Sequence, residues 1–260
     1  SRPRPRAVIQ LGRSRTRSDV AAIVPVTDAR ELTALFAALA GAPEAEALEL
    51  VLVAPRDVAA SARSTLEAAF AFYELSGRLV VPPKDAPQRL WLDLGAAAAD
   101  APMLLSWSPC ALPRDAGWLA PLVAEAERAA AAASPTLLYE DGSVFFGGDG
   151  ARRLSGYGED WITAGAARPA EACALDLCCA PRSLIEAAGG FCGGALSETY
   201  AEADFAERIA AAGGGRLWLS GVVFWRLETR ESAASDGLAA LLARVDATLR
   251  ADRMNRSDAA

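Results

Sequence analysis

Short apolar runs alternate with stretches of helical spacing in the first third of the chain, and this alternation limits the possible folds. The apolar runs are AAIVPV, ALELVLVAP and RLVVPP, at residues 21–26, 47–55 and 78–83. Runs of this kind are typical of strands buried on both faces of a parallel sheet. Between them, residues 29–43 and 61–77 carry apolar side chains at helical spacing and end at glycine or proline. The pattern predicts right-handed crossovers in an α/β sheet, with ligands expected at the carboxyl ends of the strands.

The rest of the chain continues the mixture of strands and helices. A helix over 88–102 is predicted to lead into a strand at 103–107. A loop over 108–115 and a helix over 116–133 follow, and SPTLLYEDGSVFFGGDG at 134–150 predicts a hairpin. The remaining predicted elements are a strand and short helix over 173–191, a helix from about 201 to 213–215, one or two closing strands over 216–228, and an amphipathic helix over 235–250.

Histidine is absent from the sequence, and its absence excludes several kinds of site. The chain lacks the commonest general base and the commonest transition-metal ligand, and it can form no Ser–His or Cys–His nucleophile pair. The five cysteines show no CxxC spacing. We therefore expect neither a zinc site nor a disulfide framework, which suits a reducing cytoplasm.

Charge and hydropathy bear on partners and location. The formal net charge is −7, which does not favour nucleic acid or an anionic membrane surface. Residues 1–17 nevertheless hold six arginines and no acid. We expect residues 1–19 to be a basic flexible leader, with a basic arm for a phosphate-bearing partner as the alternative. No apolar run long enough to form a transmembrane segment and no secretory signal is visible, so a cytoplasmic location is expected.

The ordered set of segments resembles the family 2 glycosyltransferases with the GT-A fold, inverting enzymes that move a sugar from a nucleotide diphosphate sugar to an acceptor. The likeness spans residues 21–228 and is carried by AAIVPVTDARELTALFAALA, LLSWSPCALPRDAGWLAPLV, TLLYEDGSVFFGGDG and, above all, APRSLIEAAGGF with ETYAEADFAERIAAAGGGRLWLSGVVFWRLE. The last piece matches the family's order of arginine-bearing helix, Gly-Gly-Phe, acidic loop, Asp-led helix, glycine stop and final strand.

The resemblance implies a GT-A type, Rossmann-like α/β fold, with a central mixed, mostly parallel sheet flanked by helices in a single domain. That domain is expected over residues 20–230, followed by a C-terminal amphipathic helix and tail over 231–260. The implied partners are a nucleotide-sugar donor and a glycan acceptor, with no nucleic acid.

For the donor's base, the family uses acids in a Val-Asp-Asp-Gly pattern after the second strand. This chain has Val53-Ala54-Pro55-Arg56-Asp57, so both acids are missing and Asp57 is a candidate only if the loop is re-routed. Asp28 follows the first strand, near where the family also contacts the nucleotide. It is equally well placed to be the N-cap of the following helix.

The family pairs the donor diphosphate with a divalent cation, held by Asp-x-Asp or Asn-Pro-Asp after the fourth strand. The aligned residues here are Ser108-Pro109-Cys110, which lack a carboxylate, and the family's histidine in the last strand is replaced within Val223-Phe224-Trp225-Arg226. A hydroxyl and a thiol are poor ligands for magnesium or manganese, so no metal is predicted. Ser108 remains a candidate donor contact. Arg226 can neutralise a diphosphate with bidentate hydrogen bonds, or be a surface arginine paired with a nearby glutamate.

For the general base, the family uses an aspartate inside Glu-Asp-x-Asp. Here the letters are Ala201-Glu202-Ala203-Asp204, so Glu202 falls on the base position and Asp204 on the second acid. A glutamate can act as a base, although its extra methylene displaces the oxygen. Both acids are also common in the first turn of a helix, where they favour its positive end.

Two functional hypotheses follow from these substitutions. The first is a glycosyltransferase that works without a metal or is impaired, with Arg226 on the diphosphate and Glu202 as base. The second is a catalytically inactive domain of the same fold that binds a carbohydrate or a protein. A third possibility is a fragment of a larger polysaccharide-assembly protein, with the arginine-rich start as the cut end of a linker. In either case exposed tryptophans can stack on sugar rings; the candidates are Trp107, Trp118, Trp161, Trp218 and Trp225, with Trp161 preferred.

Overall fold

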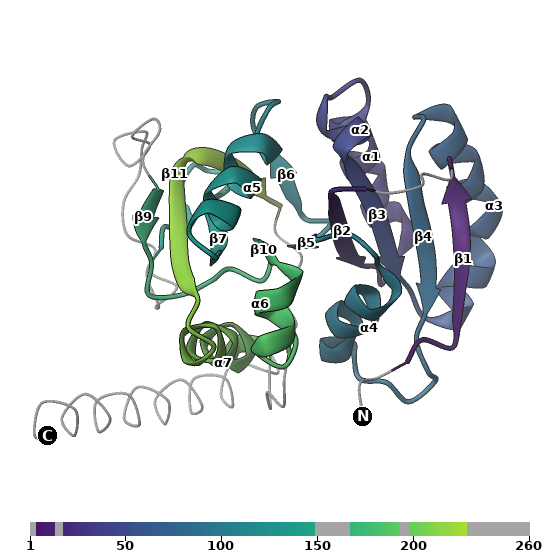
Figure 1. The fold of residues 1–260 in the computed structure, drawn as a ribbon. Helices are drawn as coiled ribbons and strands as arrows, with labels where there is room; N and C mark the ends of the chain where they lie inside the picture. Colours follow the sequence, from purple (N-terminus) through teal and green to yellow (C-terminus); the bar gives the residue numbers. More distant parts are fainter. Residues whose placement is uncertain (1–3, 14–17, 149–166, 193–197, 228–260) are drawn as a thin grey trace, which may run out of the picture.

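The computed structural model describes residues 4–13, 18–148, 167–192 and 198–227 (Figure 1). They form one sheet with the strand order β1-β4-β3-β2-β5-β10-β7-β11-β6, while β8 pairs with β7 and β9 with β11. The strands are β1 (Ala7–Gly12), β2 (Val20–Pro25), β3 (Leu48–Val53), β4 (Ser76–Val81), β5 (Met103–Trp107), β6 (Ala111–Pro113), β7 (Ala131–Tyr139), β8 (Val144–Phe146), β9 (Ala167–Pro169), β10 (Leu177–Pro181) and β11 (Gly215–Arg226).

Helices connect most of these strands. They are η1 (Ala29–Glu31), α1 (Leu32–Leu39), α2 (Glu44–Ala47), α3 (Arg56–Phe72), η2 (Gln88–Leu90), α4 (Trp91–Ala98), α5 (Leu119–Arg128), α6 (Arg182–Ala187) and α7 (Glu198–Ala211), where η marks a 3₁₀ helix. No helix among the described residues combines the length and the apolar character that crossing a bilayer requires.

The sheet is mixed around a parallel centre. β2 pairs in parallel with β3 and with β5, and β3 pairs in parallel with β4. β10 runs antiparallel to β5 and to β7, so β7 and its parallel neighbour β11 run in the same direction as β5. The carboxyl ends of β2, β5, β7 and β11 therefore lie at one edge of the sheet. β10 runs in the opposite direction, so its amino end lies at the same edge.

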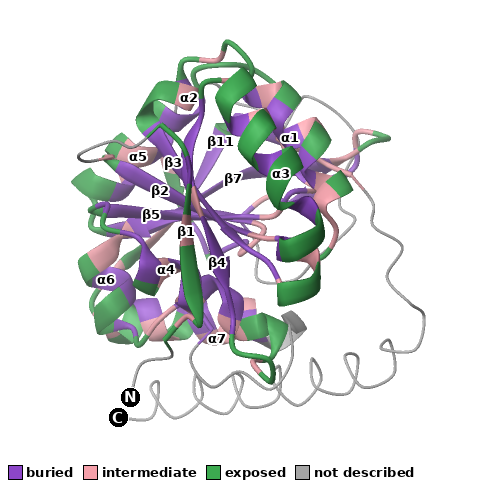
Figure 2. Ribbon diagram, turned by 90° about the vertical axis from the view of Figure 1, so that its right-hand side faces the viewer, coloured by how far each residue is buried: buried purple, intermediate pink, exposed green. Residues whose placement is uncertain are grey.

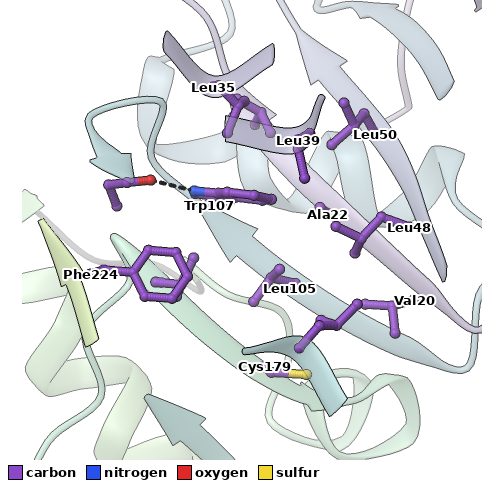
Figure 3. Packing of buried hydrophobic residues seen from close by; sticks show 14 of the residues in the cluster. Val20, Ala22, Leu35, Leu39, Leu48, Leu50, Leu105, Trp107, Cys179 and Phe224 are labelled. Carbon is purple, nitrogen blue, oxygen red and sulfur yellow. Dashed lines mark hydrogen bonds between the residues drawn. The ribbon is translucent and has the colours of Figure 1, made fainter. Parts of the chain in front are cut away.

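Helices cover both faces of the sheet (Figure 2). Side chains from α1, α3 and α5 share one apolar cluster with alternate strand residues such as Ala22 and Val24. Side chains from α4, α6 and α7 share the other cluster with the intervening residues Ala21 and Ile23. Figure 3 shows Leu35 and Leu39 of α1 over the strand residues of the first cluster. The continuously buried runs read from the sequence thus supply apolar side chains to two cores at once.

α4 approaches the sheet closely, and a glycine permits the approach. A Cβ on Gly95 would lie 2.3 Å from the Cγ2 of Ile23 and 3.0 Å from a Val53 methyl carbon. Any larger side chain would push α4 away from β2 and β3. This contact fixes the start of α4, which carries part of the site described below.

Most predicted elements are present with shifted ends, but three predictions are wrong in part. The predicted loop over 108–115 contains the short strand β6. The predicted helix over 116–133 stops at Arg128, because Ala130 has a φ of 47° and Ala131 begins β7. The residues predicted as a flexible leader contain β1, which pairs antiparallel with β4 and buries Leu11. Its alternating apolar residues, rather than the arginines around them, decide its structure. The predicted amphipathic helix over 235–250 lies outside the described residues.

Three of the five candidate tryptophans belong to the core, as most tryptophans do in a chain of this size. Trp107, Trp118 and Trp218 are buried. Trp107 and Trp118 pack edge-to-face with each other and with Phe224 beneath the edge of the sheet. Trp225 is half-buried, and Trp161 lies outside the described residues. All three indoles belong to the first apolar cluster: Trp107 and Trp218 lie in the strands β5 and β11, and Trp118 directly precedes α5.

Candidate functional site

A pocket opens at the carboxyl edge of the sheet, with a cavity volume of about 350 Å³. This is large enough for a small organic ligand. Its walls come from the ends of β2, β5 and β11, the start of β10, the segment before α4, and α7. The lining residues are Pro25, Thr27, Glu31, Gln88, Arg89, Leu92, Ser108, Pro109, Cys110, Leu175, Asp176, Cys192, Ala201, Glu202 and Arg226.

The segment between β5 and β6 forms one wall and is a tight turn held by its own backbone. The Ala111 N–H donates to the Ser108 carbonyl at 2.9 Å, and the indole Nε1–H of Trp107 donates to the Ala111 carbonyl at 2.7 Å (Figure 3). The Ser108 N–H donates to the Asp176 carbonyl at 2.7 Å, which ties the turn to the start of β10. Ser108 and Cys110 are thereby fixed at the pocket wall.

Arg226 lies at the end of β11, opposite Ala111 of β6, and the N–H of the next residue, Leu227, donates to the Cys110 carbonyl at 2.8 Å. Its guanidinium donates from Nε to Oδ2 of Asp176 at 2.8 Å. The guanidinium carbon lies 4.2 Å from the ring centroid of Phe145, a cation–π contact. With exposed fractions of 13% for Arg226 and 22% for Asp176, this ion pair is far more sheltered than a surface pair.

Glu202 reaches the pocket from α7. Its Oε1 accepts a hydrogen bond from the backbone N–H of Leu175 at 3.1 Å, which links α7 to the loop before β10. Leu175 and Asp176 are adjacent, so one short loop contacts Glu202 through its backbone and Arg226 through a side chain. The structure therefore brings Ser108, Arg226 and Glu202 into the same pocket.

Asp204 does not line the pocket. It accepts from Nε of Arg208 at 2.8 Å, one turn along α7. Arg208 also donates to the carbonyls of Ala188, Gly190 and Phe191, at 2.7, 2.5 and 2.8 Å. Asp204 thus orients an arginine that holds the Gly-Gly-Phe turn after α6, and its contacts are structural.

Asp93 of α4 holds the same turn from the other side. It accepts from the N–H of Phe191 at 2.6 Å and of Cys192 at 3.3 Å. Gly190 has a φ of 103°, and a Cβ there would lie 2.6 Å from Oδ1 of Asp93. Burial raises the pKa of Asp93, and these two hydrogen bonds and the charge of Arg208 oppose the rise. Since Cys192 lines the pocket, the turn joins α4 and α7 into one wall.

The two predicted base-binding acids lie apart from this pocket. Asp28 caps η1, accepting from the backbone N–H of Arg30 at 2.9 Å, and it also pairs with the side chain of Arg30. Asp57 is exposed in the first turn of α3, because that helix begins directly after Pro55 and leaves no loop to be re-routed. Thr27 and Glu31, on either side of Asp28, line the pocket instead. Nucleotide binding by Asp28 and Asp57 stays a prediction.

The pocket residues do not fit the divalent cation that the resemblance implies. The β5–β6 turn has no carboxylate, and both Asp176 and Glu202 accept protein hydrogen bonds. In the described part of the chain, no group of three or more His, Cys, Asp or Glu side chains is arranged to hold a metal ion. Burial raises the pKa of the Cys110 thiol, a change that Glu31 and Asp176 reinforce and that Ser108 and Arg226 oppose. Cys110 is therefore a neutral thiol near neutral pH.

Three charged pocket residues are absent from the sequence-based prediction. Glu31 sits in a segment that the sequence already marks as the start of a helix, where acids are common. Arg89 belongs to a stretch predicted as ordinary helix. Asp176 lies beside Ser108 only because β10 runs antiparallel to β5, and this pairing cannot be seen in the sequence. The one available signal was an acid just before a buried strand.

Comparison with solved structures confirms the predicted GT-A fold. One similar structure is GalNAc-T7 with UDP, GalNAc and Mn²⁺, with a TM-score of 0.58, 12% identity and coverage of 84% of this chain. Another is the mannosyltransferase PcManGT from Pyrobaculum calidifontis in complex with GDP-Man and Mn²⁺, with a TM-score of 0.63, 18% identity and coverage of 91%. The protein thus has the single mixed sheet, flanked by helices, of the GT-A glycosyltransferases.

The likeness covers only part of these two proteins, since the chain matches 45% of the first and 65% of the second. No protein-family model matches the sequence, and a search of curated proteins finds no match.

Proposed function

We propose that this protein binds a nucleotide sugar in the pocket at the carboxyl edge and transfers the sugar to a glycan or other acceptor without a divalent metal, as a divergent family 2 glycosyltransferase. One observation carries the proposal: Ser108, Arg226 and Glu202, which the resemblance assigns to the donor and the base, line a single pocket. The fold supports the substrate class, because both solved structures compared above contain a nucleotide or nucleotide sugar.

The proposed reaction needs two tasks from the chain's own residues. The acceptor oxygen attacks the anomeric carbon, the bond from that carbon to the diphosphate breaks, and the diphosphate leaves with the electron pair. Glu202 takes the proton of the acceptor hydroxyl, and its hydrogen bond to the Leu175 N–H orients the carboxylate for that role. Arg226 stabilises the charge on the leaving diphosphate, as a guanidinium matched to phosphate oxygens can.

A second function is favoured by the ion pair of Arg226 with Asp176. Asp176 offsets the charge that Arg226 would offer to a phosphate, and the pocket holds three carboxylates against two arginines. Such a lining, with Ser108, Thr27 and Gln88 beside it, suits the hydroxyls of a neutral sugar. On this alternative the protein is a catalytically inactive domain that binds a carbohydrate.

Calorimetric titration separates the two functions. UDP, GDP, their sugar conjugates and the corresponding free sugars are titrated into the protein, each with and without Mn²⁺. Micromolar binding of a nucleotide sugar that does not depend on Mn²⁺, lost in Arg226→Ala and kept in a variant of an exposed cation outside the pocket, Lys84→Ala, supports the transferase. Hydrolysis or transfer by the wild type but not by Glu202→Gln then assigns the base.

Two other results would count against the transferase. Binding of free sugars alone would support the inactive carbohydrate-binding domain. Nucleotide binding that appears only with Mn²⁺ would overturn the metal-independent mechanism.

A further inference from the structure

The two arginines of the pocket are in different electrostatic situations. Arg226 forms a sheltered ion pair with Asp176 at 2.8 Å, and its guanidinium stacks on the ring of Phe145. Arg89, in η2 just before α4, is exposed and makes no hydrogen bond or ion pair with any other residue that the structure describes. Both line the same cavity. The pocket therefore contains one arginine already compensated by a carboxylate and one that is not.

A diphosphate in this cavity needs more positive charge than Arg226 supplies. Each phosphate of a nucleotide sugar carries a negative charge, and the carboxylates of Glu31, Asp176 and Glu202 add to it. Without a metal, the charge must be balanced by side chains, and guanidinium groups are the ones suited to phosphate oxygens. Arg89 is the pocket cation whose charge no described residue offsets.

The position of Arg89 is fixed by the elements around it. The backbone N–H of Leu90 donates to the Pro87 carbonyl at 2.9 Å, which closes the 3₁₀ turn that carries Arg89. α4 follows without a break. It packs closely on the sheet at Gly95, and its Asp93 accepts a hydrogen bond from the Gly-Gly-Phe turn after α6. The side chain of Arg89 is long and exposed, but its backbone belongs to the 3₁₀ turn and α4, which are held in place at the pocket wall.

We infer that Arg89 is a second diphosphate-binding residue, which takes with Arg226 the place of the missing cation. The inference rests on the proposed function and names a residue that the family resemblance does not. Arg226 then fixes one phosphate from the end of β11, and Arg89 contacts the diphosphate from the segment before α4. Because Asp176 shares the charge of Arg226, Arg89 supplies positive charge that Arg226 alone does not provide.

The test compares ligands that differ in charge. UDP, inorganic pyrophosphate and uridine are titrated into the wild type, Arg89→Ala, Arg89→Lys and Lys84→Ala. Lys84 is the matched control, an exposed cation five positions earlier that does not line the pocket. We expect Arg89→Ala to weaken UDP and pyrophosphate binding about tenfold or more and to leave uridine binding unchanged. Arg89→Lys should restore part of the loss, and Lys84→Ala should change affinity less than about threefold at physiological salt.

The outcomes separate this inference from the proposed function. If the wild type binds UDP and Arg89→Ala binds it equally well, the inference is wrong and the proposed function stands. If the wild type binds pyrophosphate through Arg89 but no nucleotide, the anion site is supported and the proposed function fails. Binding of neither UDP nor pyrophosphate at millimolar concentration overturns both.

Discussion

At the scale of single residues, Asp176 decides how much of the charge of Arg226 reaches a ligand. Asparagine at this position keeps an oxygen that can accept from Nε of Arg226, whereas alanine removes both the acceptor and the charge. Asp176→Asn therefore removes the charge that neutralises Arg226 but keeps the acceptor that orients its guanidinium, whereas Asp176→Ala removes both.

We predict that Asp176→Asn tightens UDP binding several-fold, because a negative charge leaves the pocket while Arg226 stays in place. Asp176→Ala should bind UDP more weakly than Asp176→Asn and should lower the free energy of unfolding by about 1–3 kcal/mol, since a sheltered ion pair loses one partner. Calorimetry and urea unfolding measure the two effects. Equal UDP affinities in both variants would contradict an orienting role for Asp176.

The sequence identified part of the site at this scale. Ser108, Glu202 and Arg226 could be placed because each lies near one end of an element whose order in the chain is recognisable: just after β5, early in α7 and at the end of β11. Asp28 and Asp57 could not be excluded in the same way, since whether an acid caps a helix or faces a pocket depends on where the helix begins. In α3 the start at Arg56, rather than five residues later, removed the loop that Asp57 needed.

At the scale of elements, the turn after α6 is where α4 and α7 are joined. Asp93 holds it with two hydrogen bonds to backbone N–H groups, and Arg208 with three to carbonyls. The charged group that faces Asp93 is Arg208. The turn therefore depends on the half-buried carboxyl of Asp93, whose pKa is higher in the folded chain than in the unfolded chain.

This turn gives a pH-dependent prediction. Because the pKa of Asp93 is raised in the folded protein, its contribution to stability is fully present below the unfolded value of about 3.8 and is lost as pH rises through the folded pKa. Asp93→Asn should be less stable than the wild type at pH 3.5 by about 1–2 kcal/mol, with the gap narrowing towards neutral pH. Urea unfolding at several pH values measures this gap, and a gap independent of pH would contradict the prediction.

Helices and strands could be predicted where the pattern of apolar residues fits only one of the two. The runs at β2, β3 and β5 are short and almost wholly apolar, interrupted only by Glu49 and Ser106, so a buried strand was the best prediction for each. The alanines that begin β7, at 131–133, were predicted to be helical because alanine suits both a helix and a buried strand. The left-handed conformation of Ala130, which ends α5, has no signal in the sequence, where a glycine would have provided one.

At the scale of the whole molecule, β1 closes one side of the sheet. It covers the edge of β4 over six residue pairs and buries Leu11 to 1% exposure, and the side-chain Nε2 of its Gln10 donates to the Gly77 carbonyl of β4 at 2.9 Å. Without β1 the edge of β4 would present unpaired backbone groups, which promote self-association.

We predict that deleting residues 1–13 lowers the free energy of unfolding by about 3 kcal/mol, of which the burial of Leu11 accounts for roughly 1.5–3 kcal/mol, and causes the protein to self-associate. Deleting residues 1–3, before the described part begins, is the control and should change neither. Urea unfolding and sedimentation velocity report the two effects. Unchanged stability after the longer deletion would show that β1 is dispensable.

The position of β1 also affects the order in which the chain can fold during synthesis. β1 leaves the ribosome first among the described strands, yet its partner β4 begins more than 60 residues later. At the usual rate of translation, about 5–20 residues per second, the strand waits several seconds for that partner. The arginines that flank it, Arg4, Arg6 and Arg13, are exposed, and charged residues beside an apolar strand help to keep such a segment solvated before it pairs. The basic residues around β1 thus suit a strand that is made long before its partner, and this explanation of their charge requires no ligand.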